Sequence, residues 1–310
     1  MKFYIEQRLK YRFPSGKGAE KGTFAHRVLE ILALINLRER IDPENTVLAV
    51  EEGELDITDY SIGGIIDMLA PQFPTLSKAD IKFVRKCVDA ALSFNSGEYD
   101  PRKQYIVSTE QMFEIEFDES WALLDDGSKF KLTGKIDLVV REDEKVLHVI
   151  DYKTNKDGPK DFYSGEIKEY QDFYDDPQLR FYHWALHKTY GDDYRFIVTI
   201  AFLNTNQFFS IPFSKEHLPR TKEMIVERFK QIRATDVPAR NRSWMCTKIC
   251  DFGKNDCVGT NLPNEAQESY GNVSRIGQPK CICDKTHELI QIHGVDFVEE
   301  NFGKYSKEIK

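Results

Sequence analysis

Apolar residues at helical spacing dominate the first third of the chain. Over residues 23–40 they recur every three or four positions, which predicts a helix with Thr23 as its N-cap and a glycine-rich loop over residues 14–22 before it. Two more helices are expected near residues 59–69 and 78–95, the second opening on a serine cap. The first part of the chain is therefore expected to be helical.

Apolar and polar residues begin to alternate near residue 110, which indicates strands. The short polar link after the second strand predicts an antiparallel hairpin with the third. A helix capped by Asp176 and Pro177 and ended by Gly191 is expected next. The expected strands cover residues 110–117, 130–141, 145–153, 195–204 and 207–213, and a last helix covers 215–234.

This order of elements predicts an α/β fold, with a mixed central sheet flanked by helices. We expect an N-terminal helical lobe over residues 1–105 and a core over 106–240. A cysteine-rich segment, with a long polar loop at residues 258–280, is expected over 241–310.

Composition and charge exclude few classes of function. The chain has 310 residues, 41% of them hydrophobic, which is enough to form a core. No apolar run approaches the roughly 18 residues of a membrane span, so we expect a soluble protein of the cytoplasm, or of the host cytoplasm if the source is viral, with no membrane partner. The net charge of -8 neither indicates nor excludes nucleic-acid binding, because basic residues are concentrated within residues 1–21.

Charged residues end the strand over residues 145–153. Side chains two apart on a strand share a face, so Asp151 and Lys153 project together, while Tyr152 points away and leaves its carbonyl beside them. The hairpin brings Asp137 level with Asp151. Such an oxygen-rich site suits Mg²⁺ or Mn²⁺, and an adjacent lysine can orient a water and stabilise charge on a phosphate. The alternative is a solvated ion pair and an ordinary strand-edge aspartate.

Taken together and in this order, four fragments resemble the PD-(D/E)XK nucleases of the RecB type, which include exonuclease V and the CRISPR adaptation nucleases. GKIDLVV is followed after a short hairpin by VIDYKT, with GTFAHRVLE upstream and QLRFYHWAL downstream. The resemblance covers roughly residues 20–257. It implies a restriction-endonuclease-like core and metal-dependent hydrolysis of DNA.

The resemblance also implies a role for each matching residue. Asp137 and Asp151 would be the metal-binding carboxylates, and Lys153 would be the catalytic lysine. The Tyr152 carbonyl and the His26 imidazole would complete the metal shell. A histidine near the start of a helix is otherwise most often a surface or packing residue.

Two further residues match a motif of the family, and two glutamates have no assigned role. Gln178 and Tyr182 correspond to the Q-x-x-x-Y motif, which would lie beside the active site and the DNA backbone, although capping and packing explain such residues as well. Glu114 and Glu116 are outside candidates for a further carboxylate, and an exposed strand face explains them equally.

Five of the six cysteines are crowded near the C-terminal end: Cys246, Cys250, Cys257, Cys281 and Cys283. Such crowding in a cytoplasmic chain favours a [4Fe-4S] cluster or Zn²⁺ over disulfides, with reduced thiols as the alternative. Relatives with a cluster have a cysteine ahead of the core, which this chain lacks before His26. The fourth ligand would then be Cys87, Cys281 or Cys283, with His287 in reserve. Cys87 lies on an apolar helix face, where a small buried hydrophobe is expected.

The expected function is a metal-dependent DNA nuclease, acting as an exonuclease on single-stranded or unwound ends in recombination, repair or phage DNA metabolism. The preference for ends follows from the resemblance alone. DNA would be held by the basic residues of the first 21 positions and by Tyr182, and a helicase or recombination protein is an expected partner. A structure-specific endonuclease and a non-catalytic DNA-binding subunit with the same fold are the alternatives.

Overall fold

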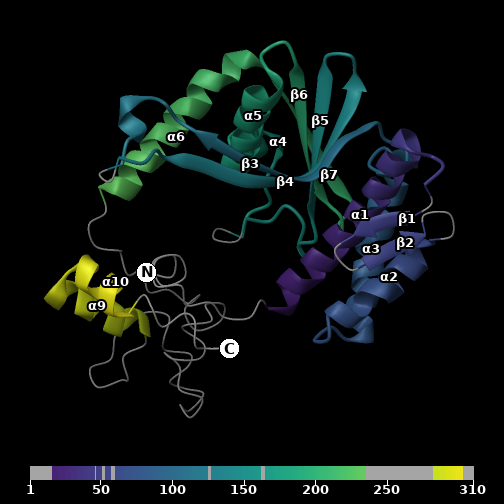
Figure 1. The fold of residues 1–310 in the computed structure, drawn as a ribbon, viewed down its shortest axis with the longest axis horizontal. Coiled ribbons are helices and arrows are strands. Elements are labelled where there is room, and N and C mark those ends of the chain that lie inside the picture. Colours follow the sequence, from purple (N-terminus) through teal and green to yellow (C-terminus); the bar gives the residue numbers. More distant parts are fainter. Residues whose placement is uncertain are drawn as a thin grey trace. The chain divides into compact units, whose positions relative to one another are not determined.

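The computed structural model describes the following residues: 16–45, 47–50, 53–56, 60–124, 127–161, 165–234 and 282–302. Residues 15–226 form one compact unit, and helices α9 (Ile282–His293) and α10 (Val295–Phe302) belong to a second (Figure 1). No helix in the described part of the chain is long and apolar enough to cross a membrane.

The N-terminal part is helical, as predicted. It contains α1 (Lys17–Ile41), a small hairpin of β1 (Val47–Val50) and β2 (Gly53–Asp56), α2 (Ile62–Leu69) and α3 (Lys78–Ser93). The serine cap of α3 is confirmed, because Ser77 forms a capping box with Asp80.

The start of α1 differs from the prediction. Its N-cap is Gly16, and Thr23 lies inside the helix, where its hydroxyl donates to the Ala19 carbonyl at 3.1 Å. The expected loop was therefore wrong for residues 17–22, and so was the Thr23 cap. The good helix formers Ala19 and Glu20 extend the helix through this glycine-rich stretch, where each glycine costs only about 1 kcal/mol.

Five strands form the main sheet, in the same order in space as along the chain. They are β3 (Ile106–Glu116), β4 (Lys131–Asp143), β5 (Val146–Lys153), β6 (Arg195–Phe202) and β7 (Gln207–Phe213). The predicted antiparallel pairing of β4 with β5 is confirmed, and the same antiparallel pairing joins β3 to β4 and β6 to β7. Only β5 and β6 run parallel, so the chain must cross over between them.

The crossover contains α4 (Tyr170–Tyr174) and α5 (Pro177–Tyr190), and α6 (Leu218–Arg233) follows the last strand. The predicted ends of α5 are confirmed. The Asp176 side chain accepts a hydrogen bond from the Gln178 amide at 2.9 Å, and Gly191 adopts a positive φ of 89° at the C-cap.

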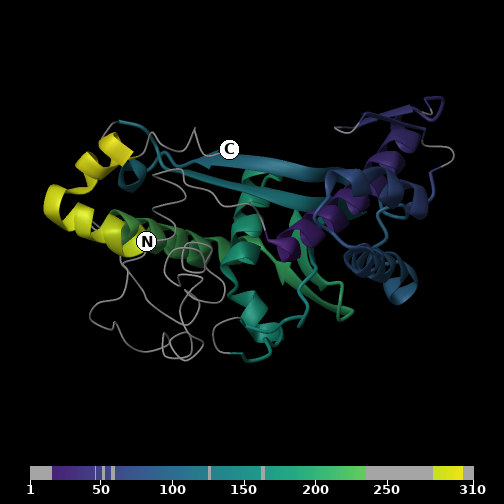
Figure 2. The ribbon, with the colours of Figure 1, turned by 90° about the horizontal axis from the view of Figure 1, so that it is seen from below.

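The two faces of the sheet bury different helices. On β4 and β5, Val140 and Ile150 belong to the core that includes α1, α2 and α3. Their neighbours Val139 and Val149 belong to the core that includes α5. Figures 1 and 2 show α1 to α3 gathered apart from α4 and α5. The site residues on β4 and β5 therefore lie between two groups of helices.

Phe113 on β3 requires a glycine beside it. Its ring lies over Gly134 on β4, where a Cβ atom would approach the ring to 2.3 Å. The same ring contacts Tyr182 edge-on, at 6.4 Å between ring centroids. Gly134 thus allows the aromatic support on which Tyr182 rests.

Buried histidines occupy the face of α5 that is turned away from the candidate site. His183 is fully buried, stacks on Phe213 at 4.8 Å between ring centroids and lies 4.6 Å from the His187 ring. Burial, together with the charges of the neighbouring histidines and Arg180, lowers the pKa of His183 to about 3.

This burial predicts a loss of stability in acid. The unfolded chain takes up a proton on His183 near pH 6.5 whereas the folded chain does not, so stability is complete above that pH and falls as the pH is lowered. Between pH 7 and pH 5 we expect a loss of about 2 kcal/mol from this residue. Urea unfolding at both pH values should show a smaller loss in His183→Phe than in the wild type; equal losses would contradict the assignment.

Candidate active site

Asp151 is almost completely buried near the end of β5, with 1% of its surface exposed. Its Oδ1 atom accepts hydrogen bonds from Gln178 Nε2 and Tyr182 Oη, both at 2.9 Å. Its Oδ2 atom lies 2.6 Å from Lys153 Nζ but makes no well-directed hydrogen bond within the described residues. Burial raises the pKa of Asp151, and the charge of Asp137 raises it further against the opposing effect of Lys153.

Helix α5 positions both residues that bind Asp151. Gln178 and Tyr182 are four residues apart, so they share one helix face, and Gln178 Nε2 also donates to Tyr182 Oη at 2.6 Å. Tyr182 Oη lies 3.0 Å from the Lys135 carbonyl on β4, and its position beside Asp151 raises its pKa, with burial as the main cause. The two residues thus connect α5 to both strands of the hairpin.

Asp137 lies beside Asp151 on the neighbouring strand. Leu138 pairs with Ile150, and the same register places Asp137 opposite Asp151. Its Oδ2 atom accepts a hydrogen bond from the Tyr152 amide at 2.8 Å. Each carboxylate therefore lies within the electric field of the other.

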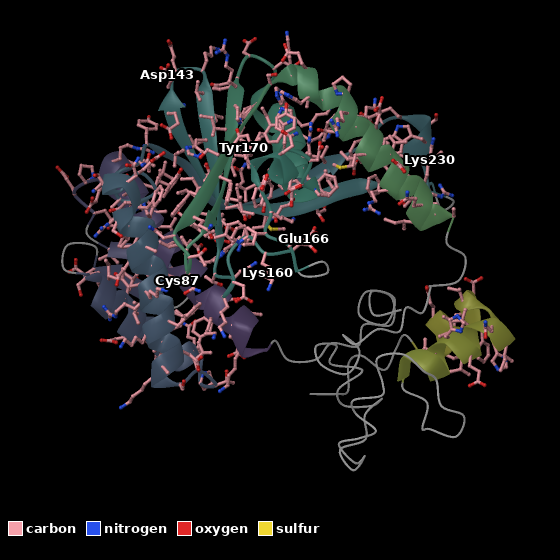
Figure 3. The ribbon with its side chains drawn as sticks, turned by 180° about the vertical axis from the view of Figure 1, so that it is seen from behind. Cys87, Asp143, Lys160, Glu166, Tyr170 and Lys230 are labelled. Atoms are coloured by element: carbon pink, nitrogen blue, oxygen red, sulfur yellow. The ribbon has the colours of Figure 1, made fainter. Side chains whose placement is uncertain are left out.

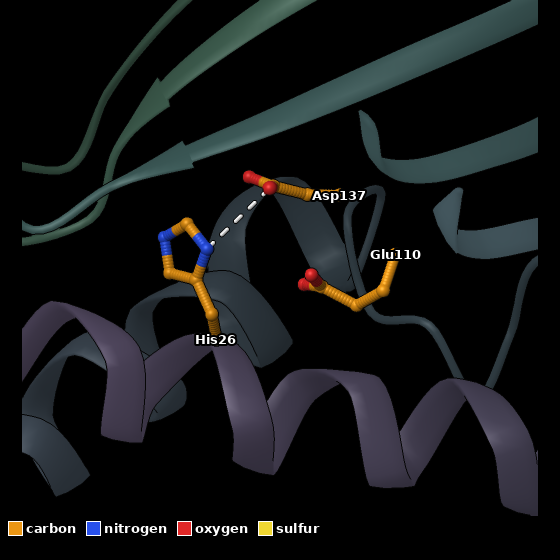
Figure 4. Close-up of side chains that lie close together, drawn as sticks. All are labelled: His26, Glu110 and Asp137. Atoms are coloured by element: carbon orange, nitrogen blue, oxygen red, sulfur yellow. Dashed lines mark ion pairs between the residues drawn. The ribbon is translucent and has the colours of Figure 1, made fainter. Parts of the chain in front are cut away.

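His26 reaches Asp137 from α1, with 3.5 Å between Nδ1 and Oδ1 (Figure 4). Burial by itself would raise the pKa of Asp137, but the hydrogen bond and charge of His26, with the Tyr152 amide, hold it below the usual value. Burial has the opposite effect on His26, yet the acidic groups around it raise its pKa. The negative charge around His26 and Asp137 thus favours a positive charge between them, either a proton on the imidazole or a metal cation.

The Tyr152 side chain lies on the other side of β5, as predicted. It is 3% exposed in the core with α1 and α3, and its hydroxyl donates to the Tyr99 carbonyl at 3.1 Å. Burial raises its pKa. Tyr152 therefore anchors the end of β5, and the role of its carbonyl toward a metal stays a prediction.

Glu110 is the site residue that the sequence pattern missed. Its carboxylate, one nitrogen of His26 and one oxygen of Asp137 lie within 4.8 Å of one another. Burial, with the charges of Asp137 and Glu30, raises the pKa of Glu110, and Lys135 opposes this effect. Position 110 continues an alternating strand, so only its backbone conformation, with φ at 49°, distinguishes it.

The two outside candidates lie elsewhere. Glu114 and Glu116 both pair with Lys131 on an exposed part of the sheet, with 2.7 and 3.0 Å between the charged atoms. They do not join the group formed by His26 and Asp137. The alternation of an exposed strand face explains both residues.

Most of the cysteine predictions fall outside the described residues. These are Cys246, Cys250, Cys257 and Cys281, and the side chain of Cys283 on α9 is not described either. Cys87 on α3 is fully buried, which confirms the expected small hydrophobe, and burial raises the pKa of its thiol to about 11. The iron–sulfur or zinc site, the basic N-terminal residues and the loop at residues 258–280 stay predictions.

The donor set fits a divalent cation. An imidazole and two carboxylates from three different elements converge, and the buried Asp151 Oδ2 lacks a well-directed hydrogen bond in the described part of the chain. Carboxylate oxygens are the preferred ligands of Mg²⁺ and Mn²⁺, and an imidazole favours Mn²⁺ of the two. The converging groups are those of His26, Glu110 and Asp137, and Asp151 lies beside Asp137 on the neighbouring strand.

One comparison with known proteins identifies the family. The family model of the PD-(D/E)XK nuclease superfamily matches residues 1–254. A search of curated proteins finds no match. Among solved structures, a protein of Eubacterium rectale named "Putative exonuclease" is 12% identical, with a TM-score of 0.46, covering 87% of this chain and 86% of that one. The protein SSO0001 is 17% identical, with a TM-score of 0.30, covering 78% of this chain and 96% of that one. The match of the family model over most of the sequence shows that this chain belongs to the PD-(D/E)XK nuclease superfamily.

Proposed function

We propose that the chain is a metal-dependent deoxyribonuclease that degrades DNA from free ends, on single-stranded or unwound DNA. The observation that carries the proposal is the pair of carboxylates on adjacent strands, the buried Asp151 and the half-buried Asp137, with Lys153 Nζ 2.6 Å from Asp151. Placing two acids side by side at low exposure costs stability, and a bound cation would offset part of that cost.

A bound divalent cation would neutralise charge on the phosphate and lower the pKa of the attacking water. The protein residues would do the rest. Lys153 would orient the water and stabilise the negative charge that develops on the phosphate oxygens. Gln178 and Tyr182 would hold the Asp151 carboxylate in one orientation through Oδ1, which leaves its second oxygen beside Lys153 free of their hydrogen bonds.

DNA would approach along the loop that follows β5. Lys156 and Lys160 in this loop are exposed, and among the described residues neither ammonium has a carboxylate partner. Lys160 is labelled in Figure 3, at the end of the sheet opposite to Asp143. These two charges, and the basic residues of the first 21 positions, are the proposed contacts to the phosphate backbone. A helicase or recombination protein is the proposed partner that would supply unwound ends.

The test uses two labelled substrates of the same sequence, one linear single strand and one closed single-stranded circle. We expect the linear strand to be shortened in Mn²⁺ or Mg²⁺, the circle to persist, and a chelator to stop the reaction. Cleavage of the circle would show that the chain is an endonuclease and not an exonuclease. Tight DNA binding without cleavage of either substrate, in both metals, would favour the non-catalytic DNA-binding subunit instead.

A further inference from the structure

Glu110 leaves the ladder of β3 at the point where β3 passes Asp137. The pairs on either side are Thr109 with Leu138 and Gln111 with Ile136, so the missing pair is Glu110 with Asp137. Glu110 takes a left-handed φ of 49°, and the Thr109 hydroxyl donates to the Asp137 carbonyl at 3.1 Å. At this position a charged side chain, only 13% exposed, lies close to the Asp137 carboxylate.

The group that results has the composition of a cation site. His26, Glu110 and Asp137 come from α1, β3 and β4, and their ligand atoms all lie within 4.8 Å of one another (Figure 4). One nitrogen and two carboxylate oxygens can bind a single Mn²⁺ ion. Without a cation, two half-buried carboxylates would repel each other at this distance.

Lys135 supplies a cation in the metal-free protein. Lys135 lies on β4, two residues before Asp137, and its ammonium forms an ion pair with the Glu110 carboxylate. The Lys135 side chain is 52% exposed, whereas its backbone lies in β4, with the carbonyl 3.0 Å from Tyr182 Oη. The backbone at this position is therefore fixed, and the ammonium is free to move into solvent.

We propose that Glu110 is a ligand of the active-site cation, and that the Lys135 ammonium occupies the charge position beside Glu110 until the cation displaces it. The inference rests on the proposed function, because it concerns the same metal site. It adds a ligand from β3 to the residues of the hairpin and α1. It also makes metal uptake an exchange of one cation for another.

The exchange predicts opposite effects for the two partners. Glu110→Gln removes a ligand charge and should weaken Mn²⁺ binding at least about tenfold. Lys135→Met removes the competing ammonium and a repelling charge, so it should tighten Mn²⁺ binding about threefold or more. The measurement is a titration of the full chain with Mn²⁺ alone. Calorimetry and the electron paramagnetic resonance signal of free Mn²⁺ report the binding.

The next ion pair along the same two strands provides a matched control. Glu114 and Lys131 also pair across β3 and β4, at 2.7 Å, but are exposed and lie outside the group. Glu114→Gln and Lys131→Met should leave Mn²⁺ affinity unchanged within about twofold. Wild-type affinity in Glu110→Gln, or unchanged or weaker affinity in Lys135→Met, would overturn the inference.

A third variant separates a ligand role from a structural one. Glu110→Gly suits the left-handed backbone, so the metal-free protein should melt at the same or a higher temperature while Mn²⁺ binding is weakened as in Glu110→Gln. A stable glycine variant with wild-type Mn²⁺ affinity would show that Glu110 is not a ligand.

The inference and the proposed function can fail separately. If the wild type cleaves DNA and Asp137→Asn loses Mn²⁺ binding while Glu110→Gln keeps it, only the role of Glu110 is wrong. If the wild type binds Mn²⁺ with the predicted dependence on Glu110 and Lys135 but cuts no DNA, only the proposed function is wrong.

Discussion

Asp151→Asn is expected to reduce metal-dependent cleavage by at least about 10³-fold without destabilising the protein. The amide removes one of the two negative charges that would bind the cation. Its oxygen can still accept the hydrogen bonds that Gln178 and Tyr182 donate to Oδ1. Because burial raises the pKa of Asp151, the ionised carboxylate is less favourable in the fold than a neutral group, so the melting temperature should stay the same or rise.

Cleavage of an end-labelled single strand and thermal unfolding in a chelator measure the two effects. Asp143→Asn is the matched control, because Asp143 lies at the opposite, hairpin end of β4, where its carboxylate accepts a hydrogen bond from the Glu144 amide at 2.7 Å. The control should keep both activity and stability. An active Asp151→Asn protein would refute the catalytic assignment. If the variant is inactive but strongly destabilised, Mn²⁺ binding decides: the assignment requires that binding is lost, and retained binding would refute it.

Lys153→Met should lower the cleavage rate by about 10²–10⁴-fold while Mn²⁺ still binds. The side chain is 27% exposed and holds its ammonium 2.6 Å from Asp151 Oδ2, where a water and a phosphate would meet. Methionine keeps most of the aliphatic contacts and removes the charge. Lys153→Arg should restore little activity, because a planar guanidinium cannot take the place of a compact ammonium.

The readouts for Lys153 are the single-turnover cleavage rate and the Mn²⁺ affinity. Lys145→Met, at the other end of the β4–β5 hairpin, is the control; its ammonium is exposed and lies 3.8 Å from Asp193. A loss of Mn²⁺ binding equal to the loss of rate would assign Lys153 to the metal site instead of the chemistry. Full activity in Lys153→Met would contradict its role altogether.

The hairpin and its acidic residues were predictable because their signals are local. Alternation and a short polar link specify β4 and β5, and a period of two places Asp151 and Lys153 on one face. Helix α5 was predictable for the same reason. The residues that cap its two ends and the spacing of Gln178 and Tyr182 can be read from a short stretch of sequence.

Errors arose where local signals were ambiguous. Glycines at 16, 18 and 22 predicted a loop, yet α1 extends through two of them, because burial of Phe24 and Ala25 along the following turns stabilises the whole helix. Glu114 and Glu116 looked as suitable as any carboxylate on β3, and only their exposure and their pairing with Lys131 separate them from the site.

The sequence by itself determined most of the helices and strands, the β4–β5 hairpin and the placement of Asp151 and Lys153 on one face of β5, since each follows from residues close together in the chain. The tertiary structure decided which distant residues meet them. His26 comes from α1, and Glu110 comes from a position opposite Asp137 on β3 where the backbone takes a left-handed φ of 49°. A backbone irregularity of this kind depends on strand pairing and packing, which no local pattern around position 110 expresses.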